Sequence, residues 1–446
     1  MTDQPPRPPT GASYDPTAEV VQVCSDLIRI DTTNFGDQDG PGERKAAEHV
    51  AALLGEVGIA AQMFESEPGR TTMVARWGET AANRHRAPLL VHGHLDVVPA
   101  NAPDWQLHPF SGEVRDGYVW GRGAVDMKDF DAMVLSVVRA RVRADVPPAR
   151  PVVLCFTADE EAGGRKGAHW LAAHHPDQVA DCTEAIGEVG GFTTTIGDQR
   201  LYLVETAEKG LAWMRLTARG HAGHGSMRHL DNAVTALSEA IARIGTHEWP
   251  VRMCPAMAQL LQVVAEIVGE RYDESDPTPL IRHFGHAARM LDAVVRNTAN
   301  PTMLDAGYKV NVVPGQATAH VDGRMLPGFE DEFFATVDEL LGDRVTREMV
   351  NHDVPLETSF DGPLADAITA AIRAEDPDAV VAPYLMSGGT DAKAWHTLGI
   401  RNFGFTPLRL PADLDFTALF HGVDERVPVG GLQFGARVLD RFLDLA

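Results

Sequence analysis

Short apolar runs alternate along the first half of the chain with stretches that have the pattern of amphipathic helices. Residues 88–91 and 151–156 are almost uninterrupted apolar runs, which is typical of strands buried on both faces of a sheet. The segments 17–30, 43–57 and 128–146 are expected to be helices. Strands that alternate with helices predict an α/β fold with a mostly parallel sheet.

This alternation changes near Gly210. From there we expect strands at 211–218, 308–313 and 317–321, and helices at 230–244, 257–268 and 279–295. The mixture predicts a smaller α+β domain inserted into the α/β domain, whose helix–strand alternation resumes after Pro327. We therefore expect a disordered tail at 1–16, an α/β domain in two parts at 17–209 and 328–446, and an inserted domain at 210–327.

Composition limits the possible partners. The chain has 446 residues, enough for two domains, and its net charge of −24 results from 63 acidic against 39 basic residues. Such a surface repels phosphate backbones and anionic lipid, which argues against nucleic acid and membrane partners. The four cysteines lack the spacing of a zinc site or a disulfide framework and fit a reducing compartment. Without an apolar run of membrane-span length or a recognisable signal peptide, we expect a cytoplasmic protein.

Polar side chains gather where the buried strands end. His94 follows the first apolar run, Glu160 and Glu161 follow the second, and Asp126 lies in a glycine-rich turn between them. Each has an ordinary structural alternative: a hydrogen-bonded histidine, a solvated helix start, or a helix cap for Asp126. Taken together, however, clustered acids at buried strand ends cost several kcal/mol unless something pairs with them. The combination favours a metal site, completed by Glu188 and a later histidine.

Three segments of the sequence resemble the three signatures of the M20 metallopeptidases. They are Gly-His-Leu-Asp at 93–96, Gly-Arg-Gly-Ala-Val-Asp-Met-Lys at 121–128 and Thr-Ala-Asp-Glu-Glu-Ala-Gly at 157–163. The likeness runs from about Ile30 to the end of the chain and is greatest to the carboxypeptidase S and N-acyl-amino-acid hydrolase branch. It implies a di-zinc α/β catalytic domain with an inserted α+β lid domain, through which a homodimer can form.

The resemblance also implies which residues bind the metals. His94 and Glu188 would bind one zinc ion, and Glu161 and His421 would bind the other. Asp126 would bridge the two ions. Glu184 is a rival for the place given to Glu188. Asp96 would accept a hydrogen bond from the far ring nitrogen of His94 and so fix its tautomer. Cobalt is a possible replacement for zinc.

Further roles follow from the same resemblance. Glu160 would be the general base and then the general acid. His224 would stabilise the oxyanion of the tetrahedral intermediate, with His221 as the runner-up. Arg324 would clamp a substrate carboxylate, as guanidinium geometry permits. The other residues expected to bind the substrate are Asn311, Gly388, Gly389 and Thr390.

The expected reaction is zinc-dependent hydrolysis of an amide bond in a dipeptide or an N-acyl amino acid with a free carboxylate. A biosynthetic desuccinylase or deacetylase is the alternative, although the insertion between Pro250 and Asn300 favours the first choice. A serine hydrolase would need a Gly-x-Ser-x-Gly turn, which Gly223-His-Gly-Ser226 does not match, and a nucleotide-binding protein would need a Walker loop. An inactive binding protein would be marked by loss of a ligand or of Glu160, and all are present.

Overall fold

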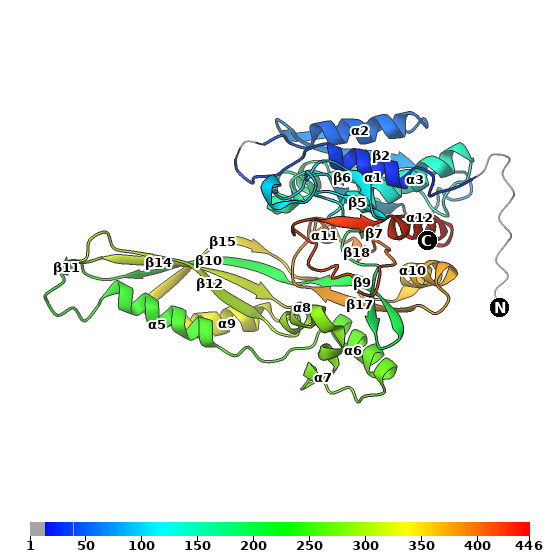
Figure 1. Ribbon diagram of the computed structural model, residues 1–446. Coiled ribbons are helices and arrows are strands. Elements are labelled where there is room, and N and C mark those ends of the chain that lie inside the picture. Colours follow the sequence, from blue (N-terminus) through cyan, green and yellow to red (C-terminus); the bar gives the residue numbers. More distant parts are fainter. Residues whose placement is uncertain (1–13, 39) are drawn as a thin grey trace. The chain divides into compact units, whose positions relative to one another are not determined.

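The computed structural model describes residues 14–38 and 40–446 and divides into two compact units. The first unit comprises the chain up to Val204, together with Phe360–Val381 and Thr390–Ala446. The second comprises Glu205–Ser359 and Ala382–Gly389. Figure 1 shows the elements of both units. Most of the tail expected at 1–16 lies outside the described residues.

The first unit is built on a mixed sheet. Its strands follow the order β1 (Ala61–Glu67), β2 (Arg70–Trp77), β6 (Val152–Thr157), β3 (Leu89–His94), β7 (Glu184–Gly187), β18 (Arg401–Gly404) and β9 (Gln199–Glu208). The central strands β6, β3, β7 and β18 are parallel, whereas β1 and β2 are antiparallel to their neighbours. β8 (Phe192–Ile196) also pairs with β9, as does β17 (Val380–Met386), of which only the first two residues belong to the first unit. This sheet confirms the predicted α/β class.

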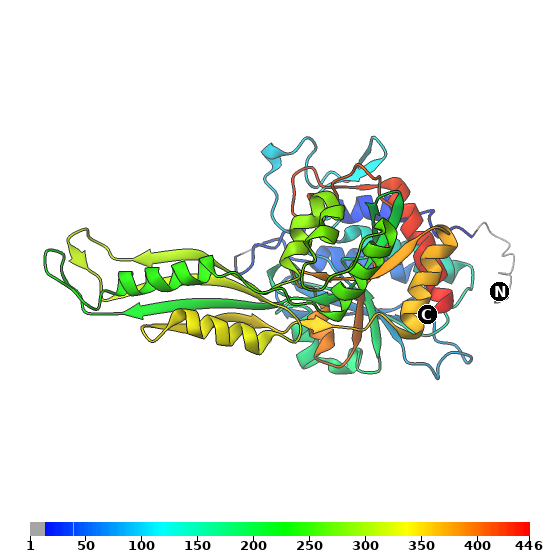
Figure 2. The same ribbon diagram turned by 90° about the horizontal axis from the view of Figure 1, so that it is seen from below.

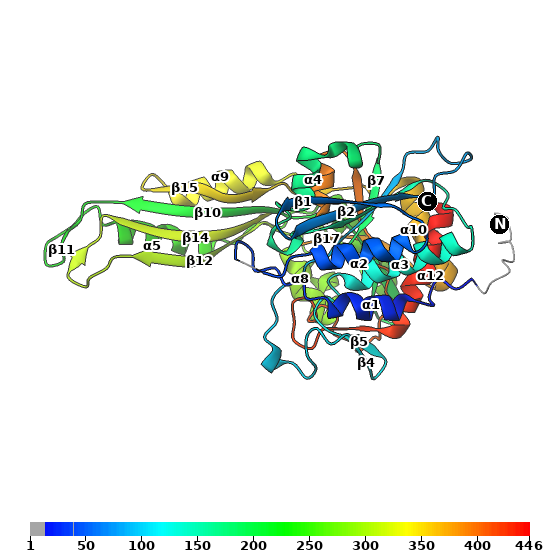
Figure 3. The ribbon, with the colours of Figure 1, turned by 90° about the horizontal axis from the view of Figure 1, so that it is seen from above.

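Helices cover both faces of this sheet. On one side, α1 (Val20–Arg29), α2 (Arg44–Gly55), α3 (Lys128–Arg143) and α12 (Val429–Leu445) lie side by side, as Figure 3 shows, and α10 (Gly362–Glu375) packs on α12. Val91 and Leu154 contribute to the apolar layer beneath α3 and α12. Their neighbours Leu90 and Val153 belong instead to the cluster packed against α4 (Ala168–His174) and α11 (Ala392–His396). Both faces of β3 and β6 are therefore apolar, which explains the uninterrupted runs in the sequence.

The first unit also contains a small sheet, whose strands contact α1 and α12. Its strands are β4 (Glu113–Arg115), β5 (Tyr118–Trp120) and β19 (Arg426–Pro428), in the order β19-β5-β4. Both pairings are antiparallel, and β19 joins β5 from the far end of the chain.

The second unit has a four-stranded antiparallel sheet. The order is β12 (Thr298–Ala306), β14 (Gln316–Met325), β10 (Gly210–Arg219) and β15 (Val345–Asp353). Helices α5 (Ala233–Thr246) and α9 (Glu330–Leu341) pack on one face of it, as Figure 2 shows. The remaining elements are α6 (Pro255–Val268), α7 (Thr278–Ile281), α8 (Ala288–Ala293), β16 (Leu356–Glu357) and a short ladder of β11 (Gly223–His224) with β13 (Val312–Val313). This separate sheet confirms the smaller α+β part of the prediction.

The observed boundaries differ from those we expected. The inserted unit was placed at 210–327, yet α9 and β15 belong to it because β15 pairs with β10 and α9 packs into the same core. The helix expected at 279–295 is interrupted at Gly285, whose φ of 56° and ψ of −118° are not helical. Of the strand expected at 308–313, only Val312–Val313 forms. No helix in the part of the chain that the structure describes has the length and apolarity needed to cross a membrane.

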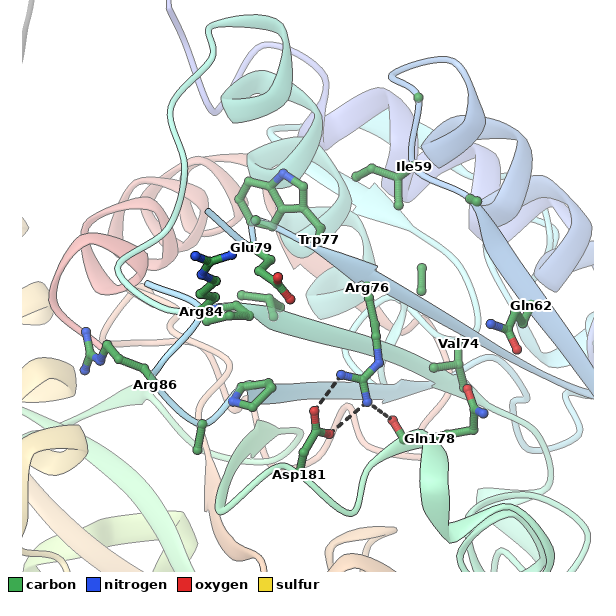
Figure 4. Close-up of a pocket in the computed structure, with 18 of the residues that line it drawn as sticks. Ile59, Gln62, Val74, Arg76, Trp77, Glu79, Arg84, Arg86, Gln178 and Asp181 are labelled. Atoms are coloured by element: carbon green, nitrogen blue, oxygen red, sulfur yellow. Dashed lines mark hydrogen bonds and ion pairs between the residues drawn. The ribbon is translucent and has the colours of Figure 1, made fainter. Parts of the chain in front are cut away.

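A polar groove of about 760 Å³ lies at the other end of the large sheet from His94 (Figure 4). Its lining includes Pro88 and Pro151, which precede β3 and β6. Arg76 within it donates to both carboxylate oxygens of Asp181 at 2.8 Å and to the main-chain oxygen of Gln178 at 2.7 Å. Among the described residues, its lining includes none of the metal-ligand candidates.

Candidate metal centre

The ends of three adjacent strands bring the candidate ligands together. His94 is the last residue of β3, Glu160 and Glu161 lie in a single 3-10 turn after β6, and Glu188 follows β7 directly. Because β6, β3 and β7 are parallel neighbours, their carboxyl ends meet at one edge of the sheet. Asp126 reaches the same edge from the turn that precedes α3.

The first group of donors surrounds His94. Its Nε2 atom lies 3.0 Å from Oδ1 of Asp126, 3.2 Å from Oε2 of Glu188 and 3.8 Å from Oε2 of Glu160. The side chain of His94 is fully buried. Glu160 is expected to lie beside a ligand without being one, whereas the structure brings it into the same group of donors as His94 and Glu188.

The second group surrounds His421. Its Nε2 atom lies 3.0 Å from Oε2 of Glu161 and 3.3 Å from Oδ2 of Asp126. Asp126 therefore turns one carboxylate oxygen to each histidine. That arrangement is what the predicted bridging carboxylate requires. All five predicted metal ligands thus lie together in the first unit, although they are far apart in the sequence.

The contact between Asp96 and His94 differs from the predicted one. The Nδ1 atom of His94 donates to the main-chain oxygen of Asp96 at 3.0 Å, whereas the nearer carboxylate oxygen lies at 3.6 Å. The tautomer is thus fixed by a carbonyl, which leaves Nε2 free for a metal. The carboxylate of Asp96 instead accepts from the main-chain N–H groups of Glu160 and Glu161, both at 3.1 Å, and from Asn34 at 2.8 Å.

Two further polar residues, His92 and Asn34, lie next to the centre. His92 packs inside the sheet as expected, edge-on to Trp395, and burial lowers its pKa to about 3. Asn34 was not singled out, although its amide donates to both Asp96 and Asp159 and its side-chain oxygen accepts from Arg70 at 2.7 Å. Its only signal in the sequence is the turn-forming stretch Asp31-Thr-Thr-Asn34.

The electrostatics of the cluster favour cations. Burial raises the pKa of Glu188 to about 7. Burial also raises the pKa of Glu161, and the negative charge of Asp126 raises it further. Burial would also raise the pKa of Asp126, but hydrogen bonds with His421 and His94 keep it below its ordinary value. Hydrogen bonds with Asp126 and Glu161 raise the pKa of His421 to about 10. Buried carboxylates that face imidazole nitrogens are the donor set that zinc prefers, so these residues fit a pair of divalent ions that replace the shared protons.

The residues predicted to bind the substrate or stabilise the oxyanion belong mostly to the second unit. His224 lies exposed on β11 in the second unit, where its Nδ1 accepts from the hydroxyl of Ser226 at 2.8 Å. Arg324 on β14 donates to both carboxylate oxygens of Asp322, at 2.7 and 3.2 Å. The main-chain oxygen of Asn311 accepts from the N–H of Gly225 at 2.9 Å.

Gly388 and Gly389 also belong to the second unit, and His221, the runner-up to His224, pairs there with Asp231. Thr390 belongs to the first unit, where its hydroxyl accepts from the N–H of Ala392 at the start of α11. The roles in catalysis and substrate binding given to these residues stay predictions.

Comparisons with known proteins agree on one family. The model of peptidase family M20/M25/M40 matches residues 90–445. The probable carboxypeptidase S-like 2 of Dictyostelium discoideum is 28% identical over 77% of this chain and 68% of its own length. The N-fatty-acyl-amino acid synthase/hydrolase PM20D1 of Xenopus tropicalis is 26% identical over 92% of this chain and 82% of its own.

A solved structure supports the same fold. The M20 family metallo-carboxypeptidase Sso-CP2 from Sulfolobus solfataricus aligns with a TM-score of 0.71 at 16% identity, over 96% of this chain and 99% of its own. At that identity the likeness shows the fold alone. The family model, which covers most of the sequence and all five candidate ligands, goes further: the chain belongs to peptidase family M20/M25/M40 and is a metallohydrolase of that family.

Proposed function

We propose that this protein hydrolyses the amide bond of a dipeptide or of an N-acyl amino acid that carries a free carboxylate. The observation that carries the proposal is Asp126, whose two oxygens face His94 and His421 while Glu188 and Glu161 complete the two groups. This set would hold two divalent ions, zinc in the first place and cobalt as the alternative. When bound, they would polarise the amide carbonyl and lower the pKa of an attacking water.

Glu160 is the proton carrier in this proposal. Its Oε2 atom lies 3.8 Å from Nε2 of His94, at the edge of the cluster, and its main-chain N–H is held by Asp96. Burial, followed by the charge of Glu188, raises the pKa of Glu160 well above its ordinary value. A carboxylate in this position would accept a proton from the attacking water and give it to the leaving amine nitrogen.

Residues of the second unit would bind the rest of the substrate. We propose that Arg324 binds the free carboxylate of the substrate. Its contact with Asp322 uses Nε and Nη2, and a guanidinium has further N–H groups in the same plane that can donate to a second carboxylate. His224 would stabilise the negative charge on the former carbonyl oxygen, and Asn311, Gly388, Gly389 and Thr390 would contact the substrate backbone.

The relatives support both substrate classes. The PM20D1 relatives are named for N-fatty-acyl amino acids, the Dictyostelium relatives for carboxypeptidase S, and aminoacylase-1 of Sus scrofa is 27% identical over 91% of this chain. A biosynthetic desuccinylase or deacetylase remains the second candidate.

A substrate panel on zinc-loaded and cobalt-loaded protein tests the proposal. It should contain N-acyl amino acids of graded acyl length, dipeptides with free and amidated carboxyl ends, acetylornithine and succinyl-diaminopimelate. We expect hydrolysis of at least one of the first two classes, loss of the activity with a chelator and its return with Zn²⁺. Hydrolysis of the last two compounds alone would favour the biosynthetic alternative, and hydrolysis that survives chelation would contradict a metal-dependent reaction.

A further inference from the structure

Two ligand-bearing segments leave the same small sheet. In the β5–β19 ladder, Trp120 pairs with Arg426 and Val119 with Val427. Gly121 follows β5 and leads to Asp126, whereas Glu425 precedes β19 and follows His421 in the chain. The N–H of Gly121 donates to the main-chain oxygen of Glu425 at 3.0 Å, which continues the ladder beyond the strands. The bridging ligand and the late histidine are therefore both anchored at this end of β5 and β19.

The carboxylate of Glu425 spans the turn that carries Asp126. It accepts from Nη1 of Arg122 at 2.6 Å and from the main-chain N–H groups of Gly123 at 3.2 Å and Val125 at 2.7 Å. Glu425 is fully buried. One side chain thus fixes the backbone of the residues that lead directly into Asp126.

Arg122 connects the same carboxylate to His421. Its second terminal nitrogen donates to the main-chain oxygen of His421 at 3.3 Å, and its side chain is almost completely buried. Its guanidinium carbon lies 5.2 Å from the ring centroid of Trp105. The hydrogen bonds therefore run from the turn of Asp126 through Glu425 and Arg122 to the backbone of His421.

His421 depends on this connection more than His94 does. Its φ of 57° is in the left-handed region and its side chain is 55% exposed. His94 is oriented through Nδ1 by a main-chain oxygen, whereas no residue in the described part of the chain forms a hydrogen bond with Nδ1 of His421. Because a ligand histidine is normally oriented through its second nitrogen, the backbone must orient His421 instead.

We propose that Arg122 and Glu425 form a positioning pair, which sets Asp126 relative to His421 and thereby the affinity of the metal subsite formed by Asp126, His421 and Glu161. Neither residue belongs to the donor groups, so both act through the ligands. The proposal rests on the proposed function only for the identity of the cation. It requires this subsite to weaken when the pair is broken, and to weaken more than the subsite of His94 and Glu188, which shares only Asp126 with it.

Glu425→Gln is the main test, because the amide keeps the shape of the side chain and removes its charge. Zn²⁺ titration against a chromophoric chelator should show two sites in the wild-type protein. In the variant, one site should weaken about 10–100-fold and the other distinctly less, since the two sites share only Asp126. Hydrolysis should fall accordingly and return when Zn²⁺ is raised, with KM for the substrate unaltered. Arg122→Lys should have the same effect, since a single ammonium cannot reproduce both contacts of the guanidinium.

The matched control is Asp440→Asn. Asp440 on α12 accepts from Arg141 on α3 at 2.7 Å, and both side chains are buried in the same unit. This variant should lower the thermal midpoint without changing either Zn²⁺ affinity. If Asp440→Asn weakened Zn²⁺ binding as much as Glu425→Gln does, the pair would only stabilise the fold, and the proposal would be overturned. So would unchanged affinities in Arg122→Lys, which serves as the test if Glu425→Gln does not fold. A wild-type protein that binds no Zn²⁺ would instead refute the proposed function, an outcome seen before any variant is made.

Discussion

Asp126 is the residue at which the two halves of the metal centre meet. Its Oδ1 atom faces His94 and its Oδ2 atom faces His421. Every other candidate ligand contacts only one of the two histidines at hydrogen-bond distance. The geometry therefore assigns Glu188 to the side of His94 and Glu161 to the side of His421.

The choice between Glu188 and Glu184 gives a prediction with an internal control. Glu188→Gln should lower the metal content toward one ion per chain, because it removes a charged donor beside His94. Glu184→Gln should keep the full content, since Glu184 lies at the opposite end of β7 and pairs with Arg150 at 2.9 Å. Elemental analysis of both variants decides the point, and metal loss in Glu184→Gln alone would reverse the assignment.

Glu160→Ala should bind both metals and fold normally, yet turnover should fall about 10²–10⁴-fold, the usual contribution of a positioned proton carrier. The measurement is kcat on the best substrate of the panel, with metal content determined on the same sample. Turnover within a few-fold of the wild-type value would remove Glu160 from the reaction.

The sequence located these acids because strand ends are recognisable from apolar runs. The partner of Nδ1 of His94 was not predictable, since the main-chain oxygen of Asp96 is brought there only by the turn after β3. Glu425 was also missed, although it lies only four residues after His421. Its partners Arg122, Gly123 and Val125 lie about three hundred residues earlier, and nothing in the local pattern links them.

At the scale of elements, the fully buried strands were predictable and an exposed edge strand was not. β3 and β6 are apolar on both faces, which leaves a clear signal in the sequence. β12, in contrast, is an edge strand with largely exposed side chains and a shift in register after Pro301. Such a strand has no buried face to mark it in the sequence. Proline is tolerated there because an edge strand has one side without a neighbouring strand, where no N–H donor is needed.

The last helix offers a prediction on packing. A Cβ atom at Gly435 of α12 would lie 2.1 Å from the sulfur of Met133 on α3 and 2.3 Å from the main-chain oxygen of Pro407. Gly435→Ala should therefore lower the free energy of unfolding by about 1–3 kcal/mol. Gly430, in the first turn of the same helix, has open space around its missing Cβ. Gly430→Ala should be neutral or stabilise by up to about 1 kcal/mol. Denaturant unfolding of both variants measures this difference, and equal stabilities would contradict the tight contact between α3 and α12.

At the scale of the whole molecule, the chain passes between the two units more often than the sequence suggested. The second unit extends to Ser359 and also includes Ala382–Gly389, a segment flanked on both sides by residues of the first unit. The sequence pattern after Pro327 resembles resumed helix–strand alternation, because α9 and β15 also follow one another as helix and strand. Only the pairing of β15 with β10 reveals to which sheet they belong.

Because His224 and Glu160 belong to different units, their cooperation can be tested across subunits. We propose a homodimer in which each second unit supplies His224 to the partner's centre, as a two-fold interface permits. Mixing Glu160→Ala with His224→Ala protein should then restore roughly one quarter of all sites, since random pairing leaves one intact site in each mixed dimer.

Activity of the mixture and proof of subunit exchange are measured together, for example with a tag on one parent. Supply of His224 within one chain leaves every site defective. A mixture that stays inactive after demonstrated exchange would thus rule out supply from the partner.

The position of β18 has a consequence for how the protein is made on the ribosome. β18 inserts between β7 and β9, although it is translated after the whole of Glu205–Ser359. Until Arg401–Gly404 emerges, the nascent first unit has an unpaired edge at β7, and the strand is needed before the sheet can close. The second unit, almost continuous in the chain, can fold earlier. We therefore expect the second unit to fold before the first is complete, because His421 is the last of the five candidate metal ligands to leave the ribosome.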